Sequence, residues 1–191
     1  MRNLTKVMLF LVAAHISIEA LAAERPIDAK RSTIRIHVGK AGAFAAAGHE
    51  HWVTAPITSG SLDAAAAHIS FRVQSAKLQV EADQSLSSEK QAEVQQTMQS
   101  QVLESDKFPE ISFQSTSVQQ TSPDTWDVSG DLTLHGQTHP VATKVRKEQD
   151  AYVGRCQLKQ TDFGIRPVRV AGGVVKVKDQ LDIDFSIVPE Q

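Results

Sequence analysis

The sequence of 191 residues contains a single cysteine, and only 5% of its residues are aromatic. One thiol, Cys156, cannot supply a disulfide framework within a chain. Twenty basic and 22 acidic residues, with no dense basic run, exclude the electrostatic footprint of a nucleic-acid-binding protein. No run of roughly 18 apolar residues occurs, which excludes a polytopic helical membrane protein. The length and composition are therefore those of one globular domain, which is long enough to bury a core without a structural metal.

Motifs of the common enzyme classes are absent as well. We find no Gly-x-Ser-x-Gly elbow, no His-Glu-x-x-His helix and no glycine-rich phosphate loop. Carboxylates such as Asp131, Asp162, Asp182 and Asp184 lie near expected strand ends, where aspartate usually forms turns. We therefore expect a binding protein and not an enzyme.

The first 23 residues are typical of a secretory signal peptide. Arg2 and Lys6 precede a short apolar run at 7–14, and small residues at 20–23 fit a cleavage site. The apolar run is too short to span a membrane. We therefore expect an exported domain of residues 24–191, in which Cys156 is a buried, inert thiol on a strand.

From Ser32 onward, apolar and polar residues alternate with a period of two. This alternation is typical of antiparallel strands with one face in water. About eight strands of this kind could close as an up-and-down barrel or stack as a sandwich, and the presence of a single helix favours the barrel. The alternating runs lie at 34–38, 69–73, 76–82, 111–113, 126–128, 132–134, 141–145, 175–177 and 181–187.

One segment, residues 87–103, breaks the alternation and indicates a helix. It is rich in helix formers, and Val94 and Met98 share one face at a spacing of four. Ser88 and Gln91 fit a capping box at its start. The narrow apolar stripe predicts an amphipathic helix across one side or the mouth of the barrel, with its glutamines in solvent.

A short motif at 131–141, DLTLHGQTHPV, predicts a strand, a tight glycine turn and a second strand. It resembles the hairpin signature of the YceI-like family of periplasmic, polyisoprenoid-binding proteins. Residues 80–86 resemble the segment that leads into the family's helix, 103–115 its exit into a strand, and 161–165 a late turn. The resemblance spans 34–187 and implies an all-β fold with one helix, an antiparallel lipocalin-like β-barrel in the periplasm.

The inside of a barrel of this size either fills with side chains or holds one small ligand. The resemblance implies a polyisoprenoid or similar amphiphile, such as an isoprenoid quinone or a long-chain lipid, held by a carrier, sink or stress factor. The alternation predicts which residues form the wall, although the same faces could form a packed core. The predicted wall residues are Phe71, Val73, Leu78, Val80, Phe113, Leu132, Leu134, Ile183 and Phe185, with Phe44 and Trp52 at the mouth and Val94 and Met98 on a helical lid.

Metal binding is a second hypothesis, because four of the seven histidines form two short clusters. His49 and His51 are two residues apart on an expected strand, and His135 and His139 flank the glycine turn. If the two pairs met at the barrel mouth, their imidazoles would suit Cu(II), Zn or Ni.

Partners other than an amphiphilic lipid stay open. The resemblance allows a redox enzyme in the membrane as a partner, and an edge strand or the helix could support a homodimer. We expect no nucleic acid, no transmembrane segment in the mature form and no cofactor apart from a bound isoprenoid-type lipid.

Overall fold

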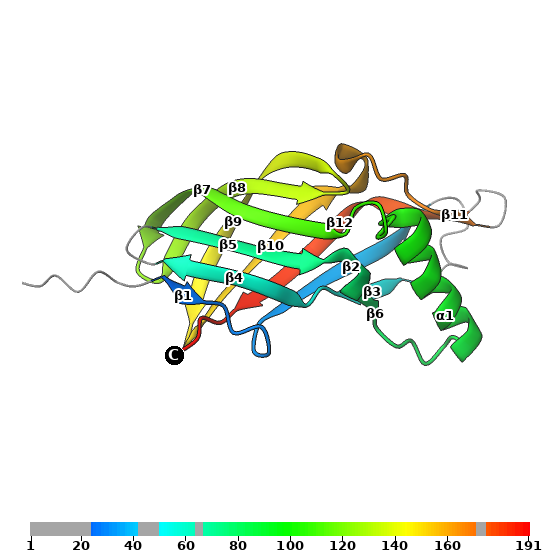
Figure 1. The fold of residues 1–191 in the computed structure, drawn as a ribbon, viewed down its shortest axis with the longest axis horizontal. Coiled ribbons are helices and arrows are strands. Elements are labelled where there is room, and N and C mark those ends of the chain that lie inside the picture. The colour runs from blue at the N-terminus through cyan, green and yellow to red at the C-terminus, as the bar shows by residue number, and fades with distance from the viewer. Residues whose placement is uncertain (1–23, 42–49, 64–66, 171–174) are drawn as a thin grey trace, which may run out of the picture.

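The computed structural model describes residues 24–41, 50–63, 67–170 and 175–191. The expected signal peptide, Phe44 and His49 lie outside these residues. Within these residues, twelve strands form one antiparallel sheet that curls into a half-barrel, with one α-helix across one end (Figure 1). The expected all-β barrel with one helix is confirmed. The higher strand count arises mainly because three of the strands have only two residues.

In chain order the strands are β1 (Arg25–Pro26), β2 (Thr33–Ala41), β3 (His51–Thr54), β4 (Ile57–Asp63), β5 (His68–Gln74), β6 (Gln79–Val80), β7 (Glu110–Ser122), β8 (Thr125–Leu134), β9 (Gln137–Glu148), β10 (Ala151–Lys159), β11 (Arg169–Val170) and β12 (Val175–Ile187). The helical elements are η2 (Ser75–Lys77), α1 (Ser88–Thr97), the π-helical turn η3 (Met98–Val102) and η4 (Gln160–Phe163). The sheet order is β1-β4-β5-β7-β8-β9-β10-β12-β2-β3-β6, and β11 pairs with β12.

The start of the described chain and its C-terminus together close one end of the barrel. Strand β1 pairs with β4, and Ile27 forms an isolated bridge with Pro189 just beyond β12. The Ile27 amide donates to the Gly60 carbonyl at 2.9 Å, and the Asp28 amide donates to the Val188 carbonyl at 2.8 Å. This segment therefore joins two parts of the sheet at the end away from α1 (Figure 1).

The predicted hairpin at 131–141 is the turn between β8 and β9. Its two turn residues, His135 and Gly136, have φ angles of 52° and 72°, as a type I′ turn requires. A Cβ on Gly136 would lie 2.7 Å from Cε1 of Phe108, so only glycine fits this position. The strand, turn and strand predicted here are confirmed.

Helix α1 begins one residue away from the predicted cap. Ser87 has extended backbone angles, and its hydroxyl accepts a hydrogen bond from the Lys90 amide, so Ser87 and not Ser88 is the N-cap. No residue of α1 is fully buried. This exposure agrees with a helix that lies across an opening, as its narrow apolar stripe predicts (Figure 1).

Candidate binding cavity

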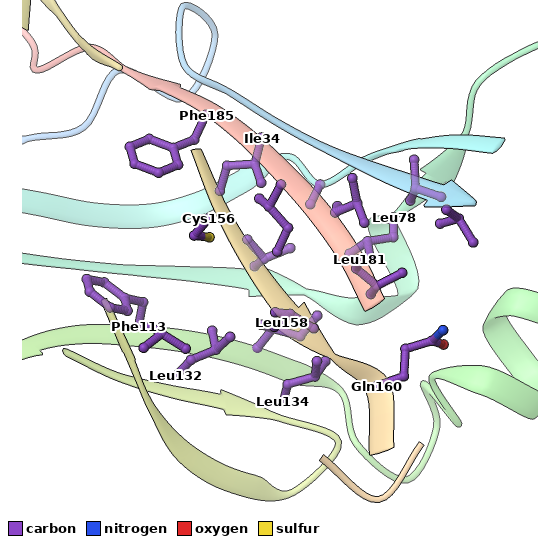
Figure 2. A pocket seen from close by; sticks show the side chains of 18 of the residues that line it. Ile34, Leu78, Phe113, Leu132, Leu134, Cys156, Leu158, Gln160, Leu181 and Phe185 are labelled. Atoms are coloured by element: carbon purple, nitrogen blue, oxygen red, sulfur yellow. The ribbon is translucent and has the colours of Figure 1, made fainter. Parts of the chain in front are cut away.

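A cavity of about 920 Å³ occupies the inside of the barrel. This volume is near the upper end of the roughly 300–1,000 Å³ that small-molecule sites have. Its wall is mostly aliphatic and aromatic, with contributions from both sides of the curled sheet and from α1. In Figure 2, Phe113 and Leu132 lie across the cavity from Ile34 and Phe185. The space is therefore suited to a long, largely apolar guest.

Eleven of the thirteen predicted wall and mouth residues line this cavity. They come from five separate stretches of sequence, 71–80, 94–98, 113, 132–134 and 183–185, and the fold brings them together around one space. The assignment of these residues to ligand binding stays a prediction. The eleven are Phe71, Val73, Leu78, Val80, Val94, Met98, Phe113, Leu132, Leu134, Ile183 and Phe185.

Trp52 is not a cavity residue. Its neighbours His51 and Val53 line the cavity, and because side chains alternate along a strand, Trp52 lies on the other face of β3. The Arg35 guanidinium lies 4.4 Å from the centre of the indole ring, and the His37 ring lies 4.9 Å away. The structure therefore does not bring Trp52 to the cavity together with the other predicted residues. Phe44 lies outside the described residues.

The wall also includes residues that the sequence analysis did not assign to a site. Most belong to alternating runs already recognised as strands, so the signal that could have found them was present. The larger unassigned wall residues are Ile34, Ile36, Val38, Ile69, Ile111, Val145, Tyr152, Leu158 and Leu181.

Two glycines of the sheet accommodate phenylalanine rings from neighbouring strands. A Cβ on Gly130 would lie 2.5 Å from Cζ of Phe113, and a Cβ on Gly154 would clash with Cζ of Phe185. Each ring thus takes the space of a missing side chain on the next strand. The aromatic rings lie against the wall, and the cavity stays open beside them.

Cys156 lies on the cavity wall between Phe185 and Phe113 (Figure 2). Burial, with a smaller contribution from the Asp184 charge, raises the pKa of the Cys156 thiol to about 11. The thiol is therefore protonated at neutral pH and a poor nucleophile. This environment agrees with the inert thiol expected from the sequence.

Three glutamines attach α1 and the adjoining η3 to the chain beside them, and we call Gln91, Gln95 and Gln99 the glutamine ladder. Gln95 Nε2 donates to the Leu78 carbonyl at 2.9 Å, while Gln95 Oε1 accepts from the Val80 amide at 2.8 Å. Gln99 Nε2 also donates to the Leu78 carbonyl, at 2.9 Å.

The first member of the glutamine ladder holds the start of the helix. Gln91 Nε2 donates to the carbonyls of Asp83 and Leu86, each at 3.1 Å, and does not return to the helix cap. The prediction that the glutamines lie in solvent is wrong for these three residues. Their spacing of four places them on one face of the helix, and that face meets backbone carbonyls that need donors.

The histidines of the metal hypothesis have other partners where the structure describes them. His135 Nε2 lies 2.8 Å from Glu104 Oε2, and this bond holds the pKa of Glu104 below its usual range. The His139 ring packs edge-on against Phe163 at 5.1 Å. His51 lines the cavity. Among the described residues, which do not include His49, no group of three or more His, Cys, Asp or Glu side chains could hold a metal ion.

In the part of the chain that the structure describes, no helix has both the length and the apolar character needed to cross a membrane.

Comparison with protein families gives one match that covers most of the chain: the model of the YceI-like domain matches residues 26–188. A UPF0312 protein of Pseudomonas putida is 36% identical over 95 residues, which are 44% of this chain and 46% of that protein. A UPF0312 protein of Azotobacter vinelandii is 37% identical over 70 residues, which are 31% and 36% of the two chains. The matched part of this chain thus spans less than half the length of these relatives.

Two solved structures share the fold at low sequence identity. A polyisoprenoid binding domain from Saccharophagus degradans, implicated in plant cell wall breakdown, superposes with a TM-score of 0.61 at 14% identity, over 89% of this chain and 98% of that chain. BcnA of Burkholderia cenocepacia gives a TM-score of 0.55 at 15% identity, over 85% and 98%. These structures have the same curled sheet.

Proposed function

The chain belongs to the YceI-like family, and from this premise we propose that it holds a polyisoprenoid or similar amphiphile inside the barrel. The observation that carries the proposal is the apolar cavity of about 920 Å³. A solved neighbour of the same fold is a polyisoprenoid binding domain, which supports a guest of this class. An isoprenoid quinone or another long-chain lipid would fit the same wall.

Burial of hydrocarbon is sufficient to drive binding of such a guest. Each CH₂-sized group removed from water contributes roughly 0.8 kcal/mol, against an association cost of about 4–15 kcal/mol. A few isoprene units therefore outweigh the cost without a strong polar contact. We expect selectivity for chain length and shape more than for the head group.

The site of action that we propose is the periplasm. The first 23 residues have the charged, apolar and small-residue regions of a cleavable signal peptide. A carrier, sink or stress factor in that compartment would keep an insoluble chain away from water between membranes. Labelling of the exported fraction of cells, together with N-terminal sequencing of the mature protein, tests this location.

Native mass spectrometry of the mature protein, purified without added lipid or chelator, tests the proposed function. We expect an extra mass of several hundred daltons that extracts into organic solvent. A bare polypeptide mass, from protein that also takes up no isoprenoid in vitro, would overturn the proposal. A bound metal ion that is lost in a His51→Ala variant would support the metal hypothesis in its place.

Helix α1 acts as the lid of the cavity in this proposal. Val94 and Met98 face the cavity, and the glutamine ladder fixes the helix to the segment Leu78–Leu86. These hydrogen bonds hold the helix closed on this side, so the lid opens when they break.

Removing Gln95 should speed the exchange of the guest. Gln95→Ala deletes two hydrogen bonds between the lid and the segment 78–80, each worth about 1 kcal/mol, so the open state gains roughly thirtyfold in population. Stopped-flow displacement of a fluorescent polyene fatty acid measures the exchange rate. A disulfide that joins α1 to β6 should have the opposite effect and slow exchange.

The matched control for the lid is Gln96→Ala. Gln96 is exposed on the same helix, and removing its side chain leaves the ladder intact. We expect its exchange rate to equal that of the unaltered protein. Equal rates for the Gln95 and Gln96 variants, or an unchanged rate in the cross-linked protein, would show that α1 is not the lid.

A further inference from the structure

A second, smaller hollow of about 590 Å³ lies beside the large cavity. It is formed by β11, the start of β12 and η4, with Arg169, Lys176 and Lys178 among its lining residues. We call it the basic hollow. The function proposed above does not use it.

The charge of the basic hollow is positive although the whole chain carries a formal charge of −2. Three cationic side chains line it, against one carboxylate, Asp179. That carboxylate is occupied: it accepts hydrogen bonds from the Thr161 amide at 2.9 Å and the Thr161 hydroxyl at 2.7 Å. These bonds hold the pKa of Asp179 below its usual range, so it stays ionised and the net charge of the lining is positive.

The basic hollow adjoins the end of the large cavity at which the lid lies. Lys176 and Val177 line both spaces. Lys40, opposite Val177 on β2, adds a further cation to the wall of the large cavity. In Figure 1, β11 and α1 lie at the same end of the barrel. Cationic groups and the opening of an apolar cavity therefore share one end of the molecule.

We propose that the basic hollow binds the phosphate group of an anionic membrane phospholipid and so docks the lid end of the barrel on a bilayer. Arginine and lysine are the usual partners of phosphate, and juxtaposed cations are attracted to anionic lipid surfaces. Docking at this end would place the opening of the cavity against the bilayer, from which an insoluble guest could enter without crossing water. The purpose of docking rests on the proposed function, but the docking itself needs no guest.

Co-sedimentation with vesicles tests the docking. We expect the mature protein to bind vesicles of phosphatidylcholine with about one third phosphatidylglycerol, to bind pure phosphatidylcholine weakly, and to be released by roughly 0.5 M NaCl. In the triple variant Arg169→Gln, Lys176→Gln and Lys178→Gln, the partition coefficient should fall about fivefold for each residue, which is on the order of a hundredfold in total.

A second triple variant, Lys30→Gln, Arg146→Gln and Lys147→Gln, is the charge-matched control. It removes the same number of cations near the Arg31–Asp150 ion pair, on elements away from the basic hollow. We expect it to keep vesicle binding within about fivefold of the unaltered protein. Equal losses in the two variants, or no preference of the unaltered protein for anionic vesicles, would overturn the proposal.

A titration with inorganic phosphate separates a membrane site from a site for a free anion. Saturable phosphate binding without vesicle binding would show that the hollow takes a soluble anion, and would also overturn docking. Native mass spectrometry of the hollow variant separates the two proposals. If the triple variant of the hollow keeps its guest and still binds vesicles like the unaltered protein, only docking fails. If the unaltered protein binds anionic vesicles but carries no guest, only the proposed function fails.

Discussion

A tryptophan in place of Cys156 should abolish most guest binding. Cys156 lies on the cavity wall beside Ile183 of the paired strand, and a larger side chain there extends into the space that the guest would fill. Each displaced CH₂-sized group costs about 0.8 kcal/mol, so loss of three or four such contacts lowers the affinity roughly a hundredfold. Titration of a fluorescent fatty acid into lipid-free protein measures the change.

The neighbouring residue provides the control for this variant. Gln157 lies on the opposite face of β10 and is exposed, so Gln157→Trp adds the same ring outside the barrel. We expect its guest affinity to stay within about twofold of the unaltered protein, and both variants to keep a cooperative melting transition. A smaller side chain, in Cys156→Leu, should give an intermediate loss. Full affinity in Cys156→Trp would mean that the guest does not occupy this part of the cavity.

Gly130→Ala should destabilise the fold. The new Cβ would lie 2.5 Å from the backbone carbonyl of Gln114 on the paired strand and 2.5 Å from Cζ of Phe113. The carbonyl belongs to a paired strand and cannot move away alone. Overpacking of this kind costs about 1–3 kcal/mol, which for a chain of this size lowers Tm by roughly 3–10 °C.

Gly39→Ala is the matched control for this stability measurement. Its Cβ would meet only the flexible side chain of Lys178, at 2.9 Å, which can swing aside. Differential scanning calorimetry should therefore give a melting temperature close to that of the unaltered protein. If Gly130→Ala melts within about 1 °C of Gly39→Ala, the close approach of the two strands at Gly130 is not needed for stability. Displacement of the Phe113 ring should also narrow the cavity, which the guest titration would detect.

Period-two alternation predicted the sheet and most of the cavity wall because an antiparallel barrel has one inner and one outer face. Leu132 and Leu134 share the inner face of β8, and Ile183 and Phe185 share that of β12. The same rule, applied to β3, would have placed Trp52 outside. Its size and its glycine-rich and alanine-rich surroundings favoured the mouth, whereas its position along the strand places it on the outer face.

The contacts of the helix could not be derived in the same way. The polar face of a helix looks the same in the sequence whether it meets water or backbone carbonyls. Gln95 binds backbone groups of Leu78 and Val80, which lie in the alternating run at 76–82, but nothing in the sequence shows that the helix folds back over this run. The basic hollow could not be derived from the sequence either, because Arg169 and Lys176 meet only through the pairing of β11 with β12.

The two bonds of Gln95 also bear on aggregation. Strand β6 is the last strand of the sheet, and an unpaired edge of this kind is a template on which strands of other chains can add. The Gln95 amide occupies both the Val80 N–H and the Leu78 carbonyl, which are the groups that an added strand would use. Lifting the helix would uncover this edge together with the apolar cavity. The closed form is therefore the form best protected against intermolecular β-pairing, and loss of the Gln95 bonds should make the protein more prone to aggregate.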